Sequence, residues 1–177
     1  MASDKKNTLF TSLSELIEIR KESLVELTQD LIKIPTLNPP GENYLEICEY
    51  LNKRLSKIGF ETQIIRAKGT PGDSDKYPRW NIIGRKEGKN SGECVHFNSH
   101  TDVVEVGLGW TFDPFGGQVF EGKVYGRGAC DMKGGLAASI IAVEAFLEAC
   151  PEYNGAIEIS GTADEETGGY GGVAYLA

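Results

Sequence analysis

The chain has 177 residues, of which 40% are hydrophobic and 25% are charged, and this predicts one globular domain with its own core. Its formal net charge of −8 argues against a nucleic-acid partner, because phosphate binding needs a basic face. No apolar stretch is long enough to span a bilayer, so we expect no membrane partner.

The first half of the chain alternates helical and extended patterns. Apolar residues at helical spacing predict a helix from Ser12, which forms a capping-box pattern with Glu15, to Pro35. A second helix is predicted from Tyr44 to Ile58. The further elements predicted are strands at 60–66, 80–85, 94–98 and 156–160, a hairpin at 118–125 and a helix at 136–146.

This alternation predicts an α/β fold, a mixed sheet with helices on both faces. Ligand sites in open α/β sheets form beyond the carboxyl ends of the strands. Three short polar segments fall at such places: His100-Thr101-Asp102 after one strand, Asp131 before a helix, and Asp164-Glu165-Glu166 after the last strand. We therefore expect these three segments to meet.

Each of the three segments carries a side chain that can bind a metal ion. Imidazole nitrogen and carboxylate oxygen are zinc ligands, and a carboxylate can bridge two metal ions. The spacing is 31 residues from His100 to Asp131 and 35 residues from Asp131 to Glu166. Each interval is long enough for one return crossing of a sheet, so the three side chains can share one sheet edge.

Four other residues have simpler interpretations. Asp164 is predicted to cap its loop, as an aspartate after a strand usually does. His96 is predicted to be a hydrogen-bonded structural residue of its strand. Trp110 and Phe115 either line a substrate cleft or belong to a loop that covers the surface, and the sequence leaves both alternatives open.

The polar segments and their neighbours also resemble a known family. The segments that carry the resemblance are Asn98-Ser99-His100-Thr101-Asp102-Val103-Val104, Asp113-Pro114-Phe115, Val124-Tyr125-Gly126-Arg127-Gly128, Asp131-Met132-Lys133-Gly134-Gly135 and Asp164-Glu165-Glu166-Thr167-Gly168-Gly169. In their order and spacing they are similar to the metal motifs of the dinuclear zinc amidohydrolases and metallopeptidases. This family includes acetylornithine deacetylase, succinyl-diaminopimelate desuccinylase, aminoacylase and carboxypeptidase G.

The resemblance implies a role for each residue. His100 would bind one zinc ion, Glu166 the other, and Asp131 would bridge both. Asp102 would orient the His100 ring, and Glu165 would be the general base that takes a proton from water. The cofactors implied are two Zn²⁺ ions, with Co²⁺ as a substitute. The resemblance also implies a cis bond between Asp131 and Met132, and no substrate-binding residue can be assigned.

We expect the two glutamates to point in opposite directions, because neighbouring side chains of extended backbone do so. Glu166 would then face metal and Glu165 would face substrate.

The family pattern also contains parts that this sequence lacks. Relatives use one further carboxylate on the first zinc ion, a late histidine on the second, and a lid or dimerisation domain between them. The only histidines here are His96 and His100. Residues 1–177 are therefore expected to be the N-terminal part of a catalytic zinc-hydrolase domain, with the lid/dimerisation domain and the C-terminal part absent.

The resemblance implies a zinc-dependent amidohydrolase that removes an acyl group from an N-acyl amino acid and is inactive as this short chain. A metallo-carboxypeptidase or dipeptidase of the same family is the first alternative. A non-catalytic fragment is the second. The partner would be a small N-acyl amino acid or peptide, and the parent protein a homodimer. The four scattered cysteines and the missing signal peptide favour a cytoplasmic location.

Overall fold

The structure, a computed structural model, describes residues 2–177, with side chains from Thr8 onward; residue 1 of the expected domain lies outside the described residues. Its helices are α1 (Ala2–Ile19), α2 (Lys21–Ile32), α3 (Tyr44–Lys57), α4 (Lys133–Ala149) and α5 (Val173–Leu176). Its strands are β1 (Glu61–Arg66), β2 (Trp80–Glu87), β3 (Asn90–His100), β4 (Gln118–Phe120), β5 (Lys123–Tyr125) and β6 (Asn154–Thr162), and a 3₁₀ turn, η1, covers Glu165–Thr167.

The N-terminal helix differs from the prediction. The expected single helix from Ser12 to Pro35 is two helices, α1 and α2, which are separated at Arg20. The helix already begins at Ala2, so Ser12 lies in its interior and caps nothing. Of these two helices, α2 buries Leu27 and Leu31 in the core, whereas the side chain of Ile19 at the end of α1 is exposed. The prediction of a single helix failed because apolar residues keep the same helical spacing through α1 and α2, so the spacing gives no sign of the break at Arg20.

The main sheet is mixed, as predicted. Its strand order is β1-β2-β6-β3, with β1–β2 and β2–β6 antiparallel and β3–β6 parallel. The hairpin of β4 and β5 forms a separate two-stranded sheet. Because β3 and β6 are parallel, they end at the same edge, where His100 pairs in register with Thr162. The segments His100-Thr101-Asp102 and Asp164-Glu165-Glu166, which follow these two strands, therefore leave the sheet side by side.

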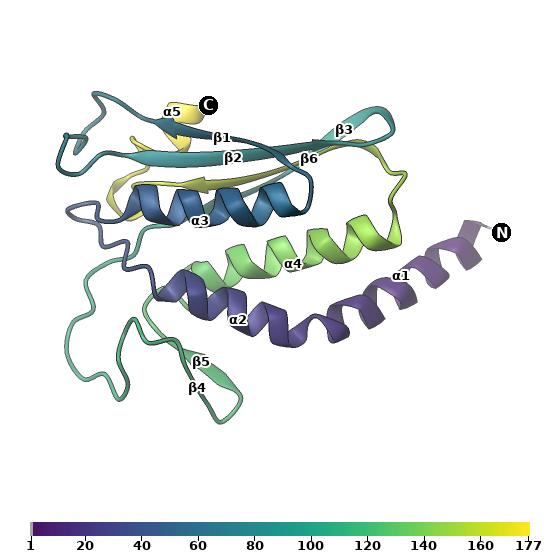
Figure 1. Cartoon of the computed structure of the whole chain (residues 1–177), viewed down its shortest axis with the longest axis horizontal. Coiled ribbons are helices and arrows are strands. Elements are labelled where there is room, and N and C mark those ends of the chain that lie inside the picture. Colours follow the sequence, from purple (N-terminus) through teal and green to yellow (C-terminus); the bar gives the residue numbers. More distant parts are fainter. Residues whose placement is uncertain (1) are drawn as a thin grey trace.

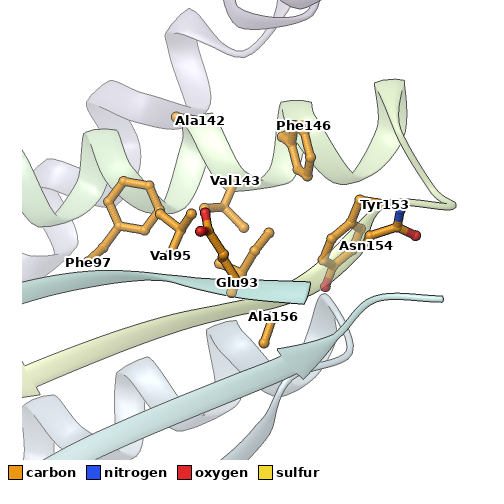
Figure 2. Close-up of a pocket in the computed structure, with 10 residues that line it drawn as sticks. Glu93, Val95, Phe97, Ala142, Val143, Phe146, Tyr153, Asn154 and Ala156 are labelled. Carbon is orange, nitrogen blue, oxygen red and sulfur yellow. The ribbon is translucent and has the colours of Figure 1, made fainter. Parts of the chain in front are cut away.

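The long helices cover one face of the sheet (Figure 1). The α carbon of Gly161 faces α3 so closely that a Cβ there would lie 2.9 Å from Leu51 Cδ1. On this same face, the β3 residues Val95 and Phe97 and the α4 residues Val143 and Phe146 line an apolar pocket of about 270 Å³ (Figure 2). Both α3 and α4 therefore pack on one side.

The mixed α/β class is confirmed, but the expectation of helices on both faces is wrong for the long helices described. The opposite face carries polar side chains. Among them are Arg85 of β2 and Glu158 of β6, whose Nη1 and Oε1 atoms are 2.6 Å apart. These residues alternate with the apolar residues that face the helices, so this face is compatible with water. Within residues 2–177, no helix combines the length and apolar character that a membrane crossing requires.

The exposed edge of β3 generates the first prediction. Within the described residues β3 pairs only with β6, and Val95 at its outer part is 55% exposed. An unpaired strand edge beside apolar surface favours pairing with another chain. We expect the 177-residue chain to self-associate in sedimentation velocity at increasing concentration.

Val95→Lys should reduce this association, because a charge on an edge strand opposes pairing. Gln63→Lys places the same charge on β1, the other edge strand of the sheet, and should have less effect. A chain that remains monomeric at all concentrations tested would contradict the prediction.

Candidate metal centre

His100 lies at the end of β3 and is almost completely buried. Its Nδ1 is 3.0 Å from the backbone oxygen of Asp102, and its Nε2 is 2.9 Å from Oδ1 of Asp131. Burial opposes a charge on the ring, but the carboxylates of Asp102 and Asp131 outweigh it and raise the pKa of His100 to about 9. Because a ligand nitrogen must be unprotonated, metal binding by His100 would release a proton.

Asp131 comes from the loop that leads into α4, and its carboxylate is 75% exposed. The loop is closed by a hydrogen bond from Lys133 N to Gly128 O at 2.8 Å. Gly128 has φ +86°, and a Cβ there would lie 2.8 Å from Val103 Cγ1, so this position requires glycine. The bond between Asp131 and Met132 is cis, as the family resemblance implied.

Lys133 anchors the same loop from inside the protein. Its side chain is fully buried, and Nζ donates to the backbone oxygen of Ile34 at 2.7 Å. Burial lowers the pKa of Lys133 to about 7. The loop that carries Asp131 is thus attached to the segment that follows α2.

Glu165 and Glu166 lie in the 3₁₀ turn η1, so the expected extended backbone is wrong here. The turn brings both carboxylates towards the same histidine, and Glu165 Oε2 is 3.7 Å from His100 Nε2. Burial, followed by the carboxylates of Asp131, Asp102 and Glu165, raises the pKa of Glu166 even though His100 opposes this. A cation would relieve the repulsion among these carboxylates.

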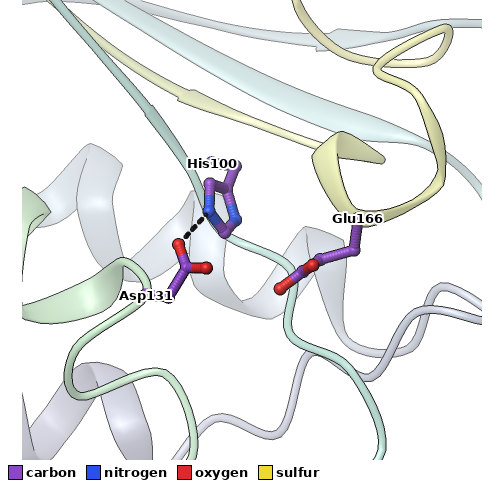
Figure 3. A group of neighbouring side chains, drawn as sticks. All are labelled: His100, Asp131 and Glu166. Atoms are coloured by element: carbon purple, nitrogen blue, oxygen red, sulfur yellow. Dashed lines mark hydrogen bonds and ion pairs between the residues drawn. The ribbon is translucent and has the colours of Figure 1, made fainter.

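The predicted convergence is confirmed. His100, Asp131 and Glu166 each offer one ligand atom, and these three atoms lie within 4.8 Å of one another (Figure 3). Two ligand atoms on one zinc ion are at most about 4.4 Å apart, because each bond is about 2.0–2.2 Å long. Small side-chain rotations would therefore let the three groups share an ion, and the donor set of one imidazole and two carboxylates suits zinc.

Asp102 contacts both His100 and the turn that carries the two glutamates. Its carboxylate is completely buried and accepts hydrogen bonds from Glu165 N at 3.2 Å, Glu166 N at 3.1 Å and Asn38 Nδ2 at 2.9 Å. Its Oδ1 is 3.6 Å from His100 Nδ1, so the backbone oxygen of Asp102 is the nearer acceptor for the ring. Burial would raise the pKa of Asp102, but its partners lower it below the usual value. Asp102 therefore joins the histidine to the glutamate turn.

Asp164 does not simply cap its loop. Its carboxylate is buried, 3.0 Å from Arg79 Nε, and accepts a hydrogen bond from the Tyr44 hydroxyl at 3.1 Å. This buried ion pair fixes the start of η1 and was not predicted from the sequence. Arg79 stands in a loop 85 residues before its partner, and no spacing rule in the sequence connects the two.

The aromatic residues of the long loop lie outside the metal centre. An open cavity of about 280 Å³ adjoins the site, and its lining includes Asn98, His100, Asp131 and Thr162. Trp110 is not among its lining residues and instead donates through Nε1 to a backbone oxygen of its own loop. His96, on β3, is 2.9 Å from the Ser160 hydroxyl, which agrees with its structural interpretation.

Comparison with known proteins gives agreeing results. Residues 96–177 match the profile of peptidase family M20/M25/M40. The chain is 39% identical over 144 residues to a succinyl-diaminopimelate desuccinylase of Cereibacter sphaeroides, which covers 80% of this chain and 34% of that protein. The chain thus spans about a third of the length of this relative.

Solved structures share the fold. The dipeptidase Dug1p of Saccharomyces cerevisiae has a TM-score of 0.77 at 25% identity, covering 89% of this chain and 35% of that one. The metallo-carboxypeptidase Sso-CP2 of Sulfolobus solfataricus has a TM-score of 0.67 at 23% identity, covering 81% and 31%.

The converging ligand atoms generate a prediction about zinc. We expect calorimetric titration of the chain with Zn²⁺ to show binding that weakens by about tenfold or more in His100→Ala and in Glu166→Gln, because each removes a ligand. His96→Ala removes the other histidine of the same strand and should leave binding unchanged. Equal binding by all variants would contradict this assignment of ligands.

The buried ion pair generates a prediction about stability. Asp164→Asn should lower the free energy of unfolding by about 3–5 kcal/mol, because it leaves the Arg79 charge buried without its partner. The loss would be measured by denaturant unfolding. Glu87→Gln breaks an exposed ion pair with Arg85 and should cost far less. Equal losses in the two variants would show that burial of the pair does not matter.

Proposed function

We propose that the protein is a zinc-dependent amidohydrolase, because residues 96–177 match the profile of peptidase family M20/M25/M40. The observation that carries the proposal is the convergence of His100, Asp131 and Glu166 from three separate segments. Such a donor set at the carboxyl ends of parallel strands lies where α/β enzymes place their ligand sites.

The proposed metal content is two zinc ions, with Co²⁺ as a substitute. His100 would hold one ion, Glu166 the other, and Asp131 would lie between them. When bound, the ions would polarise an amide carbonyl and make water acidic enough to react near neutral pH. Burial, followed by the repulsion among the clustered carboxylates, raises the pKa of Glu166, and this repulsion supports a cationic occupant.

Glu165 is the proposed general base. Its carboxylate lies near His100 Nε2 and, unlike that of Glu166, is not among the three converging ligand groups. It is therefore free to take a proton from the attacking water and to return it to the leaving amine. Asp102 would assist by holding the backbone of Glu165 and Glu166 through its two hydrogen bonds.

The proposed reaction removes an acyl group from an N-acyl amino acid. Support comes from the 39% identity to a succinyl-diaminopimelate desuccinylase, which is higher than the 23–25% identity to the peptidases Dug1p and Sso-CP2. Peptide cleavage by a dipeptidase or carboxypeptidase is the second candidate function, favoured by the TM-score of 0.77 to Dug1p. The third is a folded fragment without catalytic activity.

We further propose that the 177 residues form the N-terminal part of the catalytic domain. The coverage of about a third of the relative supports this, as does a site with one histidine and two carboxylates for two ions. Further ligands and the lid/dimerisation domain would then lie outside these residues, in a parent protein that is homodimeric. The four free cysteines support a reducing, cytoplasmic location.

The general-base role is tested by Glu165→Gln in a protein completed with the remaining catalytic segments. We expect turnover of N-succinyl and N-acetyl amino acids to fall by about 10²–10⁴-fold, because proton transfer from water is lost. Zinc affinity should stay nearly unchanged. Glu166→Gln is the matched control and should weaken zinc binding.

The 177-residue chain alone should show almost no amide hydrolysis with added zinc, because the cavity beside the candidate site is open and would not exclude water from a substrate. Equal rates for the short and completed proteins would contradict the proposed division of the catalytic domain. A completed protein that cleaves dipeptides but no N-acyl amino acid would favour the second candidate function.

A further inference from the structure

Asn38 is a buried side chain that links Asp102 to the η1 turn of the candidate metal centre through hydrogen bonds. It lies between α2 and α3, and its Nδ2 donates to Asp102 Oδ2 and to Thr167 Oγ1, both at 2.9 Å. We propose that Asn38 is a positioning residue, which holds the Asp102 carboxylate against the η1 turn and so aligns His100 with Glu166. This inference rests on the proposed function of the site.

The hydrogen bonding of Asn38 is unbalanced in a way that favours this role. Its Oδ1 is buried and has no hydrogen-bond partner among the described residues. A buried carbonyl without a donor costs free energy, so an apolar residue would be preferred here if the position only filled space. Both hydrogens of the amide are used, one on Asp102 and one on Thr167. Asn38 therefore satisfies two acceptors, Asp102 and Thr167, while its own side-chain oxygen has no donor among the described residues.

The Asp102 carboxylate depends on this donor. Its other hydrogen bonds come from the backbone of Glu165 and Glu166, and its Oδ1 is 3.6 Å from His100 Nδ1. His100, a proposed ligand, contacts the backbone oxygen of Asp102. Among the other side chains described, Asn38 alone donates a hydrogen bond to Asp102 within 3.5 Å. Without it, the carboxylate could turn towards the histidine ring and release the glutamate backbone.

The backbone of Asn38 is held in register with the segment it serves. Asn38 N donates to Val103 O at 2.9 Å, and Val103 N donates to Thr36 O at 3.0 Å. Leu37 and Val103 form a short parallel bridge. The backbone of Asn38 is therefore already paired with Val103, the residue next to Asp102. The side-chain amide of Asn38 loses little conformational freedom when it forms its two hydrogen bonds.

The test compares Asn38→Ala with Ile140→Val, a core substitution in α4 that reduces stability without reaching the site. Thr167→Val removes the second acceptor of Asn38 and provides a milder variant in case Asn38→Ala does not fold. Two quantities are measured on the 177-residue chain: amide hydrogen exchange at Glu165 and Glu166 without metal, and the affinity for Zn²⁺ alone.

We expect Asn38→Ala to speed exchange at these two amides by about tenfold or more relative to other amides of equal protection, and to weaken zinc binding by about 10–100-fold. Thr167→Val should shift both in the same direction by less. Ile140→Val should change neither selectively. Exchange at Glu165 and Glu166 that follows global stability alone, in the same way in all variants, would overturn the proposal.

The two proposals fail separately. If the unsubstituted chain and the completed protein bind no zinc, the proposed function is wrong, while the exchange measurement still decides whether Asn38 positions the turn. If zinc binds but Asn38→Ala changes neither the affinity nor the selective exchange, the metal centre stands and the role of Asn38 is wrong.

Discussion

The candidate site depends on one buried negative charge. The carboxylate of Asp102 is shielded from water, and a charge in that position is tolerated only with hydrogen-bond donors around it. It obtains them from Asn38 and from the backbone of Glu165 and Glu166, which are 64, 63 and 64 residues away in the chain. If any of these segments moved, the Asp102 carboxylate would be exposed to water or left without a hydrogen-bond donor. Asp102 therefore fixes the relative positions of strand β3, η1 and the turn after α2.

Much of the site could be predicted because its determinants are local. His100 ends strand β3, Glu166 lies in the turn that follows strand β6, and Asp131 precedes helix α4, so strand and helix patterns placed them near element ends. The parallel pairing of β3 with β6 then makes convergence a consequence of topology. The same reasoning placed α3, α4 and the hairpin, because each is bounded by glycine or polar turns.

The parts that were missed depend on partners far away in the chain. Nothing near Arg79 indicates that it would pair with Asp164, and nothing near Asn38 indicates that it would serve Asp102. The location of the long helices on one face also follows from packing, because α3 and α4 both meet the apolar side of the sheet. The turn that brings Glu165 and Glu166 to the same histidine is held by those distant contacts together with its own backbone hydrogen bonds, such as that from Gly169 N to Asp164 O at 2.6 Å.

The buried lysine at the start of α4 makes the stability of the folded state depend on pH. Lys133 has a pKa of about 7 in the folded chain, whereas an exposed lysine in the unfolded chain titrates near 10.4. Between these values unfolding takes up a proton, so this residue makes the folded state more stable as the pH rises from about 7 to about 10.4, and most of that gain is absent below pH 7. A side chain that anchors the Asp131 loop by a single hydrogen bond thus makes part of the domain's stability rise with pH, whereas His100, whose pKa is raised, favours the folded state at lower pH.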